Sequence, residues 1–177
     1  MRRLLLLMCV LAVSLTASTK ATPRLFTVFG CKTTEKVCFV GYNLGGSIID
    51  FLRAAQEIKK FNIMLVIDGD CGSACAMVAD VTRGSTNSCV TPRGTFHFHQ
   101  ARSEERVVVE GVEHYSVKYS IPPRTDPIDE WNQKKGGWPI VGYNRMPYPE
   151  TLDYWKECPN VPLPRANLRR KAKTAAK

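Results

Sequence analysis

The first half of the chain alternates apolar and polar residues in a way that predicts short strands and helices in turn. Two segments rich in Val, Phe and Tyr, 25–29 and 37–42, predict strands joined as a hairpin. Apolar residues then recur at helical spacing over 47–60, with Ser47 as the N-cap, which predicts an amphipathic helix. The apolar run 63–67 predicts a buried strand.

A turn is expected over 68–72, and a second helix from Ser73 toward Val81. Strand, helix, strand and helix in this order indicate a parallel sheet. The second half of the chain is less regular. Its pattern predicts two short strands, a hairpin around Gly111 that projects from the body, and two short helices separated by a glycine-containing loop, at 88–91, 95–99, 106–110, 112–119, 127–135 and 149–157.

The first 21 residues have the order of a secretory signal peptide. Arg2 and Arg3 precede the apolar run 4–13, and small or hydroxylated residues follow up to a cleavage site expected between Ala17 and Ala21. An apolar run of this length is too short to span a bilayer, and no other segment is longer. We therefore expect export to the periplasm or the extracellular space, with no integral membrane span.

The remaining length is typical of one domain, so we divide the chain into a signal peptide at 1–21, one domain at 22–160 and a basic tail at 161–177. The formal charge of +9 is concentrated at the two ends and leaves the domain nearly neutral. A nucleic-acid-binding domain usually spreads basic residues over a folded face. We therefore expect no nucleic-acid partner.

Six cysteines follow the expected signal peptide, an even number in a chain destined for an oxidising compartment. Disulfides are the expected state, and six cysteines allow 15 pairings. One local bridge, between Cys31 and Cys38, suits a short hairpin, and a second hypothesis has Cys71 or Cys75 bonded to Cys89. The full set of candidates is Cys31, Cys38, Cys71, Cys75, Cys89 and Cys158.

Three local features carry the candidate chemistry: Gly45-Gly46 before a helix, Gly72-Ser73-Ala74 at a strand-to-helix turn, and His99 at the end of a strand. Each alone has an ordinary structural explanation, as a tight turn, a helix N-cap or a packed histidine. Their order along the chain, Gly-Gly, helix, strand, Ser, helix, strand and His, is more specific than any one of them, because it matches the layout of a known family.

In combination, these features resemble the Clp protease proteolytic subunit and its crotonase-fold relatives. The resemblance covers GGSIIDFLRAAQEIKKFNIMLVIDGDCGSACA and VTPRGTFHFHQ, about a third of the chain, with Ser73 and His99 26 residues apart. It is strongest to small exported members with a Cys-x-Ser-Ala-Cys turn. The resemblance implies an α/β crotonase/ClpP-like fold with short twisted parallel strands and packing helices.

The resemblance also implies roles for individual residues. Ser73 attacks the scissile carbonyl, His99 takes the serine proton, and the backbone amides of Gly46 and Ala74 hold the oxyanion. Gln100 matches the residue that follows the family's histidine, which favours His99 over His97. For the third member of the triad the sequence departs from the family, and none of the candidates matches a motif: Asp126, Asp129, Asp153 and Asn144.

Two departures bear on partners. The hairpin around Gly111 stands where the family has a handle that builds rings, so ring assembly does not follow, although an oligomer is compatible with the sequence. An exported chain also meets no ATP, so we expect no unfolding ATPase as partner. The substrates expected are short peptides or unfolded protein segments, with no cofactor.

Other interpretations of the same residues remain open. Cys71, Cys75, His97 and His99 could be drawn as a zinc site, but their spacing is not that of a standard zinc finger. A thiol nucleophile at Cys71 or Cys75 would be lost on oxidation. The serine peptidase-like hydrolase has two alternatives. The first is a catalytically inactive ClpP-like binding or scaffold domain in the periplasm. The second is acyl-CoA chemistry as in crotonases, whose cofactor is not expected outside the cytoplasm.

Overall fold

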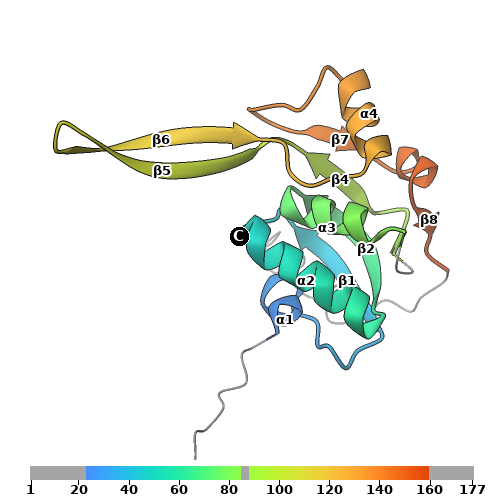
Figure 1. Ribbon diagram of the computed structural model, residues 1–177. Coiled ribbons are helices and arrows are strands. Elements are labelled where there is room, and N and C mark those ends of the chain that lie inside the picture. Colours follow the sequence, from blue (N-terminus) through green and yellow to red (C-terminus); the bar gives the residue numbers. More distant parts are fainter. Residues whose placement is uncertain (1–22, 85–87, 160–177) are drawn as a thin grey trace, which may run out of the picture.

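The protein is mixed α/β, with a curled mixed sheet covered by helices (Figure 1). The computed structural model describes residues 23–84 and 88–159. The expected signal peptide and the whole of the expected basic tail therefore lie outside the described residues. Within the described ranges, no helix has the length and apolar character needed to cross a membrane.

The six-stranded sheet is organised around β2 (Met64–Gly72), which pairs in parallel with three other strands. On one side lies β1 (Val37–Asn43), and on the other lie β3 (Cys89–Val90) and then β4 (Thr95–Phe98). The edges are β8 (Lys156–Glu157), parallel to β3, and β7 (Asn144–Met146), antiparallel to β4. The parallel sheet predicted from the alternation of strands and helices is thus confirmed at its centre.

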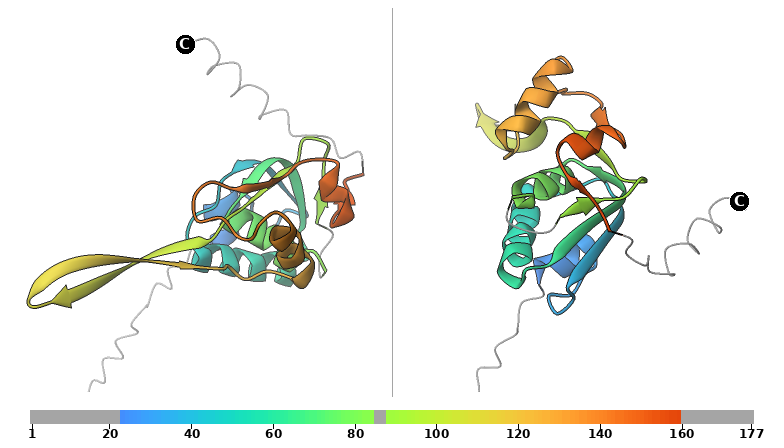
Figure 2. Two further views of the ribbon diagram at one scale, coloured as in Figure 1. Left: turned by 90° about the horizontal axis from the view of Figure 1, so that it is seen from above. Right: turned by 90° about the vertical axis from the view of Figure 1, so that its right-hand side faces the viewer.

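Helices α2 (Ile48–Phe61) and α3 (Ala74–Thr82) lie beside each other on one face of this sheet (Figure 2). Ser47 is the N-cap of α2 and accepts a hydrogen bond from Asp50 N–H, as the sequence predicted. Almost all of α3 is buried, and with Leu65 and Ile67 of β2 it belongs to the hydrophobic core. This packing fixes the junction between β2 and α3 at the centre of the molecule.

The segment 25–29 is a helix, so the predicted first strand and its hairpin are wrong. Helix α1 (Arg24–Phe29) ends at Gly30, whose φ of 74° suits a glycine C-cap. The backbone N–H groups of Arg24 and Leu25 donate to the Glu57 carboxylate of α2, at 3.0 and 2.8 Å. Because this carboxylate supplies acceptors for the free amides of the first turn, a tertiary contact overrides the local β-propensity.

The predicted turn at 68–72 is also wrong, because β2 continues through these residues. It stays paired with β1 up to Cys71 and with β4 from Asp70 onward. The backbones of β1 and β2 approach each other closely at Gly69, where an added Cβ would lie 1.8 Å from the carbonyl oxygen of Gly41. Gly69, which in the sequence suggests a turn, is therefore needed for the close approach of β2 to β1.

The C-terminal part of the described chain differs from the prediction in two places. Helix α4 (Asp126–Lys134) matches the expected helix at 127–135. At 149–157, however, only a 3₁₀ turn, η1 (Glu150–Asp153), precedes β8. Strand pairing of β8 with β3 and the Cys89–Cys158 disulfide hold the chain extended there. Strand β7 was not predicted at all, since a three-residue strand has too few residues to show a period.

A long antiparallel ribbon, β5 (Ala101–Val109) and β6 (Val112–Ser120), projects from the body (Figure 1). It confirms the predicted hairpin around Gly111, with longer strands than expected. Its side chains are almost all exposed, including Tyr115 at 70%. The ribbon therefore adds little to the core of the domain.

We predict that deleting the ribbon leaves the body folded. Joining Ala101 to Ser120, which are already register partners, through an Asn-Gly turn should change the free energy of unfolding by less than about 1 kcal/mol, because exposed residues away from the core contribute little. Urea unfolding followed by tryptophan fluorescence measures this change, since all three tryptophans lie outside the ribbon. Loss of cooperative unfolding would show that the ribbon is part of the folding unit.

Candidate active site

Ser73 is the single residue between β2 and α3. Its φ of 55° and ψ of −124° place a residue other than glycine in a rarely populated region of the backbone map. Such a conformation costs about 1–3 kcal/mol and is found chiefly at functional sites. The turn is tied to β4 by a hydrogen bond of 2.8 Å from Ser73 N–H to the carbonyl oxygen of His97. A hydroxyl side chain is thus held in a strained strand-to-helix turn.

The loop before α2 packs directly on this turn through Gly45. An added Cβ at Gly45 would lie 2.6 Å from Ala74 N and 2.8 Å from both Gly72 O and Ser73 Cβ. Gly45 also has a φ of 89°, and its N–H donates to the Asn43 side chain at 2.9 Å. Close approach and backbone conformation both require glycine here, so the segment 45–46 belongs to the site.

The backbone amides near Ser73 are suited to binding an anion. Ala74 is the first residue of α3, and the first four N–H groups of a helix have no acceptor within the helix. These amides also carry the partial positive charge of the helix N-terminus. Gly46 follows Gly45 in the loop that packs against the Ala74 amide. The two residues predicted as oxyanion donors, Gly46 and Ala74, therefore belong to segments that pack together at the Ser73 turn.

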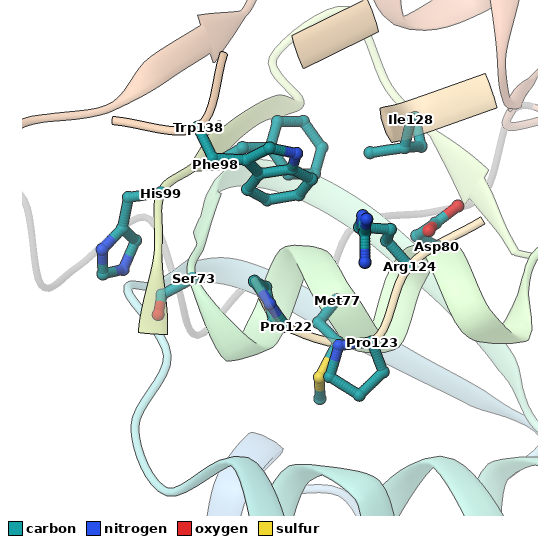
Figure 3. Close-up of a pocket in the computed structure, with 10 residues that line it drawn as sticks. All are labelled: Ser73, Met77, Asp80, Phe98, His99, Pro122, Pro123, Arg124, Ile128 and Trp138. Atoms are coloured by element: carbon teal, nitrogen blue, oxygen red, sulfur yellow. The ribbon is translucent and has the colours of Figure 1, made fainter. Parts of the chain in front are cut away.

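A small pocket opens beside this turn, and both Ser73 and His99 line it (Figure 3). These two residues lie at one end of the pocket, while Ile128, Asp80 and Arg124 lie at the other (Figure 3). Its walls are mostly apolar or aromatic. They come from α3, the end of β4, the segment leading to α4 and α4 itself, and the loop that follows α4: Met77, Phe98, Pro122, Pro123, Ile128 and Trp138.

His99 follows the last residue of β4 and is half-buried. Its ring packs edge-to-face against the ring of Tyr143, with the ring centroids 4.8 Å apart. Burial lowers the pKa of His99, because it penalises the charged imidazolium. The ring is therefore neutral at pH 7, the form in which an imidazole nitrogen can accept a proton.

Ser73 and His99 line the same pocket but are not hydrogen-bonded to each other. Within the described part of the chain, neither the Ser73 hydroxyl nor the His99 ring forms a hydrogen bond. Catalytic hydrogen bonds are often long in ligand-free enzymes and shorten when substrate binds. The arrangement therefore brings a hydroxyl group and an imidazole ring to one pocket without a hydrogen bond between them.

None of the four residues considered as a third triad member forms a hydrogen bond with His99 in the described part of the chain. Asp129 accepts from Arg124 Nε at 2.8 Å and from Trp138 Nε1 at 2.7 Å. Asn144 donates to Asn132 and to the carbonyl oxygen of Gly137. Asp126 begins α4 and Asp153 ends η1. Among the described residues, no carboxylate forms a hydrogen bond with His99.

The structure does contain a histidine–carboxylate pair, but it uses the other histidine. His97 Nε2 lies 3.1 Å from Asp70 Oδ1. The register of β2 and β4 aligns His97 with Gly72 and Asp70 with Thr95, so the two side chains point to the same face of the sheet. The sequence did not indicate Asp70 as a partner of His97, because residues 68–72 were predicted to form a turn. In the structure they belong to β2, which places Asp70 on the same sheet face as His97. Of the two histidines, only His99 lines the pocket.

Asp80 is a second carboxylate that the sequence did not single out. It is buried in α3, and burial raises its pKa. Its oxygens accept from the backbone N–H of Thr125 at 2.6 Å and from the Thr125 hydroxyl at 2.7 Å. Arg83 pairs with it at 3.5 Å. Asp80 thus holds the segment before α4 against α3 and fixes one end of the pocket.

All six candidate cysteines form disulfides, in three pairs. Cys31–Cys38 matches the predicted local bridge, although it links the end of α1 to β1 instead of closing a hairpin. Cys71 bonds to Cys75, and Cys89 bonds to Cys158, so the hypothesis of a bridge from Cys71 or Cys75 to Cys89 is wrong. The pairing of Cys71 with Cys75 leaves neither thiolate free for zinc or for nucleophilic attack.

Comparison with known proteins adds no relative to this description. No family model matches the chain, and neither a curated protein nor a solved structure gives a significant match.

We predict that Gly45→Ala destabilises the protein more than Gly30→Ala does. Both glycines have positive φ, which costs about 1–2 kcal/mol for alanine, but an added Cβ meets nothing within 4 Å at Gly30. The clash with the Ser73 turn should add a further ~1–3 kcal/mol at Gly45. Urea unfolding of the two variants measures the difference. Equal destabilisation would contradict the close contact between the loop and the turn.

We further predict that His99 titrates below 6.5, its pKa in an unstructured peptide. The unfolded state then binds more protons than the folded state as the pH falls below 6.5, so His99 destabilises the fold in acid. NMR titration of the histidine ring protons gives the midpoint, assigned with His99→Gln. In urea unfolding between pH 7 and 5.5, the wild type should lose more stability than this variant. A midpoint at or above 6.5 would disprove the expected effect of burial.

Proposed function

We propose that the protein is an exported serine peptidase-like hydrolase with a ClpP/crotonase-like fold, acting on peptide bonds through Ser73 and His99. The observation that carries this proposal is the strained backbone of Ser73 at the start of α3, beside a pocket that also contains His99. The position gives the serine hydroxyl a nearby base and a nearby helix N-terminus. Serine acyl transfer requires both.

The proposed reaction begins when the Ser73 hydroxyl oxygen attacks the carbonyl carbon of the scissile bond. His99 accepts the hydroxyl proton, and the electron pair of the carbonyl moves to its oxygen. The amides of Gly46 and Ala74 stabilise that oxyanion, and one strong donor of this kind contributes about 3–4 kcal/mol. When the C–N bond breaks, His99 returns the proton to the leaving amine, and water later releases the acyl group by the same route.

The fold supports the family part of the proposal in one respect beyond the sequence. The glycine loop, the serine turn and the end of β4 are distant in sequence, yet they adjoin one another at the end of β2. This is the arrangement that the resemblance to the Clp protease proteolytic subunit implies for the oxyanion loop, the nucleophile and the histidine. Parallel pairing of β2 with β1 and β4 produces it.

Export is supported by the three disulfides, which persist in oxidising compartments. They agree with the signal peptide expected from the first 21 residues. The pocket beside Ser73 is small and its walls are mainly apolar. A folded protein surface would not enter such a pocket, so short peptides or unfolded segments are the proposed substrates.

The alternative is a catalytically inactive ClpP-like binding or scaffold domain. One observation favours it: in the described part of the chain, no carboxylate hydrogen-bonds to His99, whereas Asp70 pairs with His97 outside the pocket lining. Without an acceptor, the orientation and tautomer of the His99 ring are less restrained. Loss of the orienting carboxylate in a serine protease triad lowers turnover by about four orders of magnitude.

A fluorophosphonate probe distinguishes the two functions. We expect it to label the wild type at Ser73, with Ser73→Ala unlabelled and Ser47→Ala labelled normally, because Ser47 is only the N-cap of α2. Mass spectrometry of the labelled peptide locates the probe. An unlabelled Ser73 in protein that unfolds cooperatively would exclude the hydrolase and favour the binding domain.

The two histidines give a matched pair for the same assay. His99→Gln should slow labelling of Ser73 by about 10²–10⁴-fold, the usual contribution of a general base. His97→Gln removes the contact with Asp70 and should change the rate by less than about threefold, since His97 does not line the pocket. A larger loss for His97→Gln than for His99→Gln would reassign the base.

A further inference from the structure

The Cys71–Cys75 disulfide spans the nucleophile turn. Cys71 is the penultimate residue of β2 and Cys75 the second residue of α3, so the bridge closes over Ser73 with a Cα–Cα distance of 5.3 Å. Both cysteines are fully buried. The strand and the helix are therefore joined covalently on the two sides of Ser73.

The Ser73 side chain does nothing to hold its own strained backbone. It forms no N-cap hydrogen bond to α3, and no other hydrogen bond of its hydroxyl occurs within the described ranges. The backbone is restrained by the Ser73 N–H bond to His97 and by contact with Gly45. A rarely populated conformation persists only when its surroundings overdetermine it. The disulfide is the covalent member of these restraints.

This disulfide is also poorly placed to stabilise the fold as a whole. The loops closed by the three bridges have sequence separations of 4, 7 and 69 residues, and Cys71–Cys75 closes the shortest. Restriction of the unfolded chain grows with loop length, so the shortest loop contributes least to global stability. The main effect of this bridge is therefore local, on the turn it encloses.

We propose that the Cys71–Cys75 disulfide is a positioning element that sets the reactive geometry of Ser73. The inference rests on the proposed function, and the cysteines act only through the serine. Removing the bridge frees the Ser73 backbone to leave its strained conformation, which displaces the hydroxyl from the pocket and shifts the Ala74 amide. A displacement of about 1 Å at a reacting group costs on the order of 10²-fold in rate.

Two double variants of the full chain test this, C71A/C75A and its matched control C31A/C38A. Both remove one short-loop disulfide between buried cysteines. We expect C71A/C75A to lower the second-order rate constant of fluorophosphonate labelling at Ser73 by roughly 10–100-fold, in line with the cost of misplacement. The control should stay within about threefold of the wild type. The two variants should have similar Tm values, because both remove a disulfide that closes a short loop.

The pH profile separates positioning from general damage. The acidic limb of the labelling rate belongs to His99, so C71A/C75A should lower the rate at every pH without moving that limb. A wild-type rate in folded C71A/C75A, or an equal loss in C31A/C38A, would overturn the inference. If C71A/C75A does not fold, C71V/C75A, which retains more of the buried volume, takes its place in the same comparison.

Hydrogen exchange at the Ser73 amide, measured on the same samples, needs no reaction. This N–H bonds to the His97 carbonyl in the intact turn, so its exchange should accelerate more than tenfold in C71A/C75A and remain unchanged in C31A/C38A. Unchanged exchange in C71A/C75A overturns the inference even if the wild type does not react with the probe. An unreactive wild type whose exchange responds as expected contradicts the proposed function and leaves the disulfide as a restraint of the turn alone.

Discussion

The structure depends on β2, which among the described strands is the one that pairs in parallel with three others. Its first residues are buried between β1 and β3, and its last residues are held between β1 and β4. Strand β4 pairs with only the last three residues of β2, Asp70–Gly72, and the hydrogen bond from Ser73 N–H to the His97 carbonyl oxygen holds the end of β4 beside the turn after Gly72. The buried packing of β2 and α3 therefore places Ser73 and His99 at the same pocket. No interaction between the two side chains is required for that placement.

Covalent links reinforce this arrangement at three different scales. The Cys89–Cys158 bridge closes a loop of 69 residues and holds β8 against β3. Nearby, Trp155 stacks on Phe96 with ring centroids 4.2 Å apart and donates to the carbonyl oxygen of Ala79. The long loop gives this bridge the largest effect on the unfolded chain. The two shorter bridges act locally, one between α1 and β1 and the other across Ser73.

The pocket contains a histidine, His99, that is not hydrogen-bonded to either of the nearby carboxylates, Asp80 and Asp70. His99 is neutral because burial disfavours its charged form, while Asp80 at the other end of the pocket is occupied by Thr125 and Arg83. The Asp70–His97 pair lies on β2 and β4 without lining the pocket. A neutral histidine can accept a proton, but among residues 23–84 and 88–159 no carboxylate is hydrogen-bonded to His99 to stabilise the imidazolium that forms. The absence of a carboxylate hydrogen-bonded to His99 in the described residues is the observation that favours the binding domain over the proposed hydrolase.

The sequence alone determined the amphipathic helix after Ser47, the buried strand after it, the helix expected from Ser73 and found at Ala74–Thr82, and the hairpin around Gly111, because these elements depend on local periodicity. Only the tertiary structure decided the rest. Helix α1 forms where β-propensity predicted a strand, because the Glu57 side chain of α2 accepts hydrogen bonds from its first amides. The pairing of Cys89 with Cys158, the side-chain contact of Asp70 with His97 and the tight contact of Gly45 with Ala74 all join segments that only folding brings together, so no local pattern encodes them.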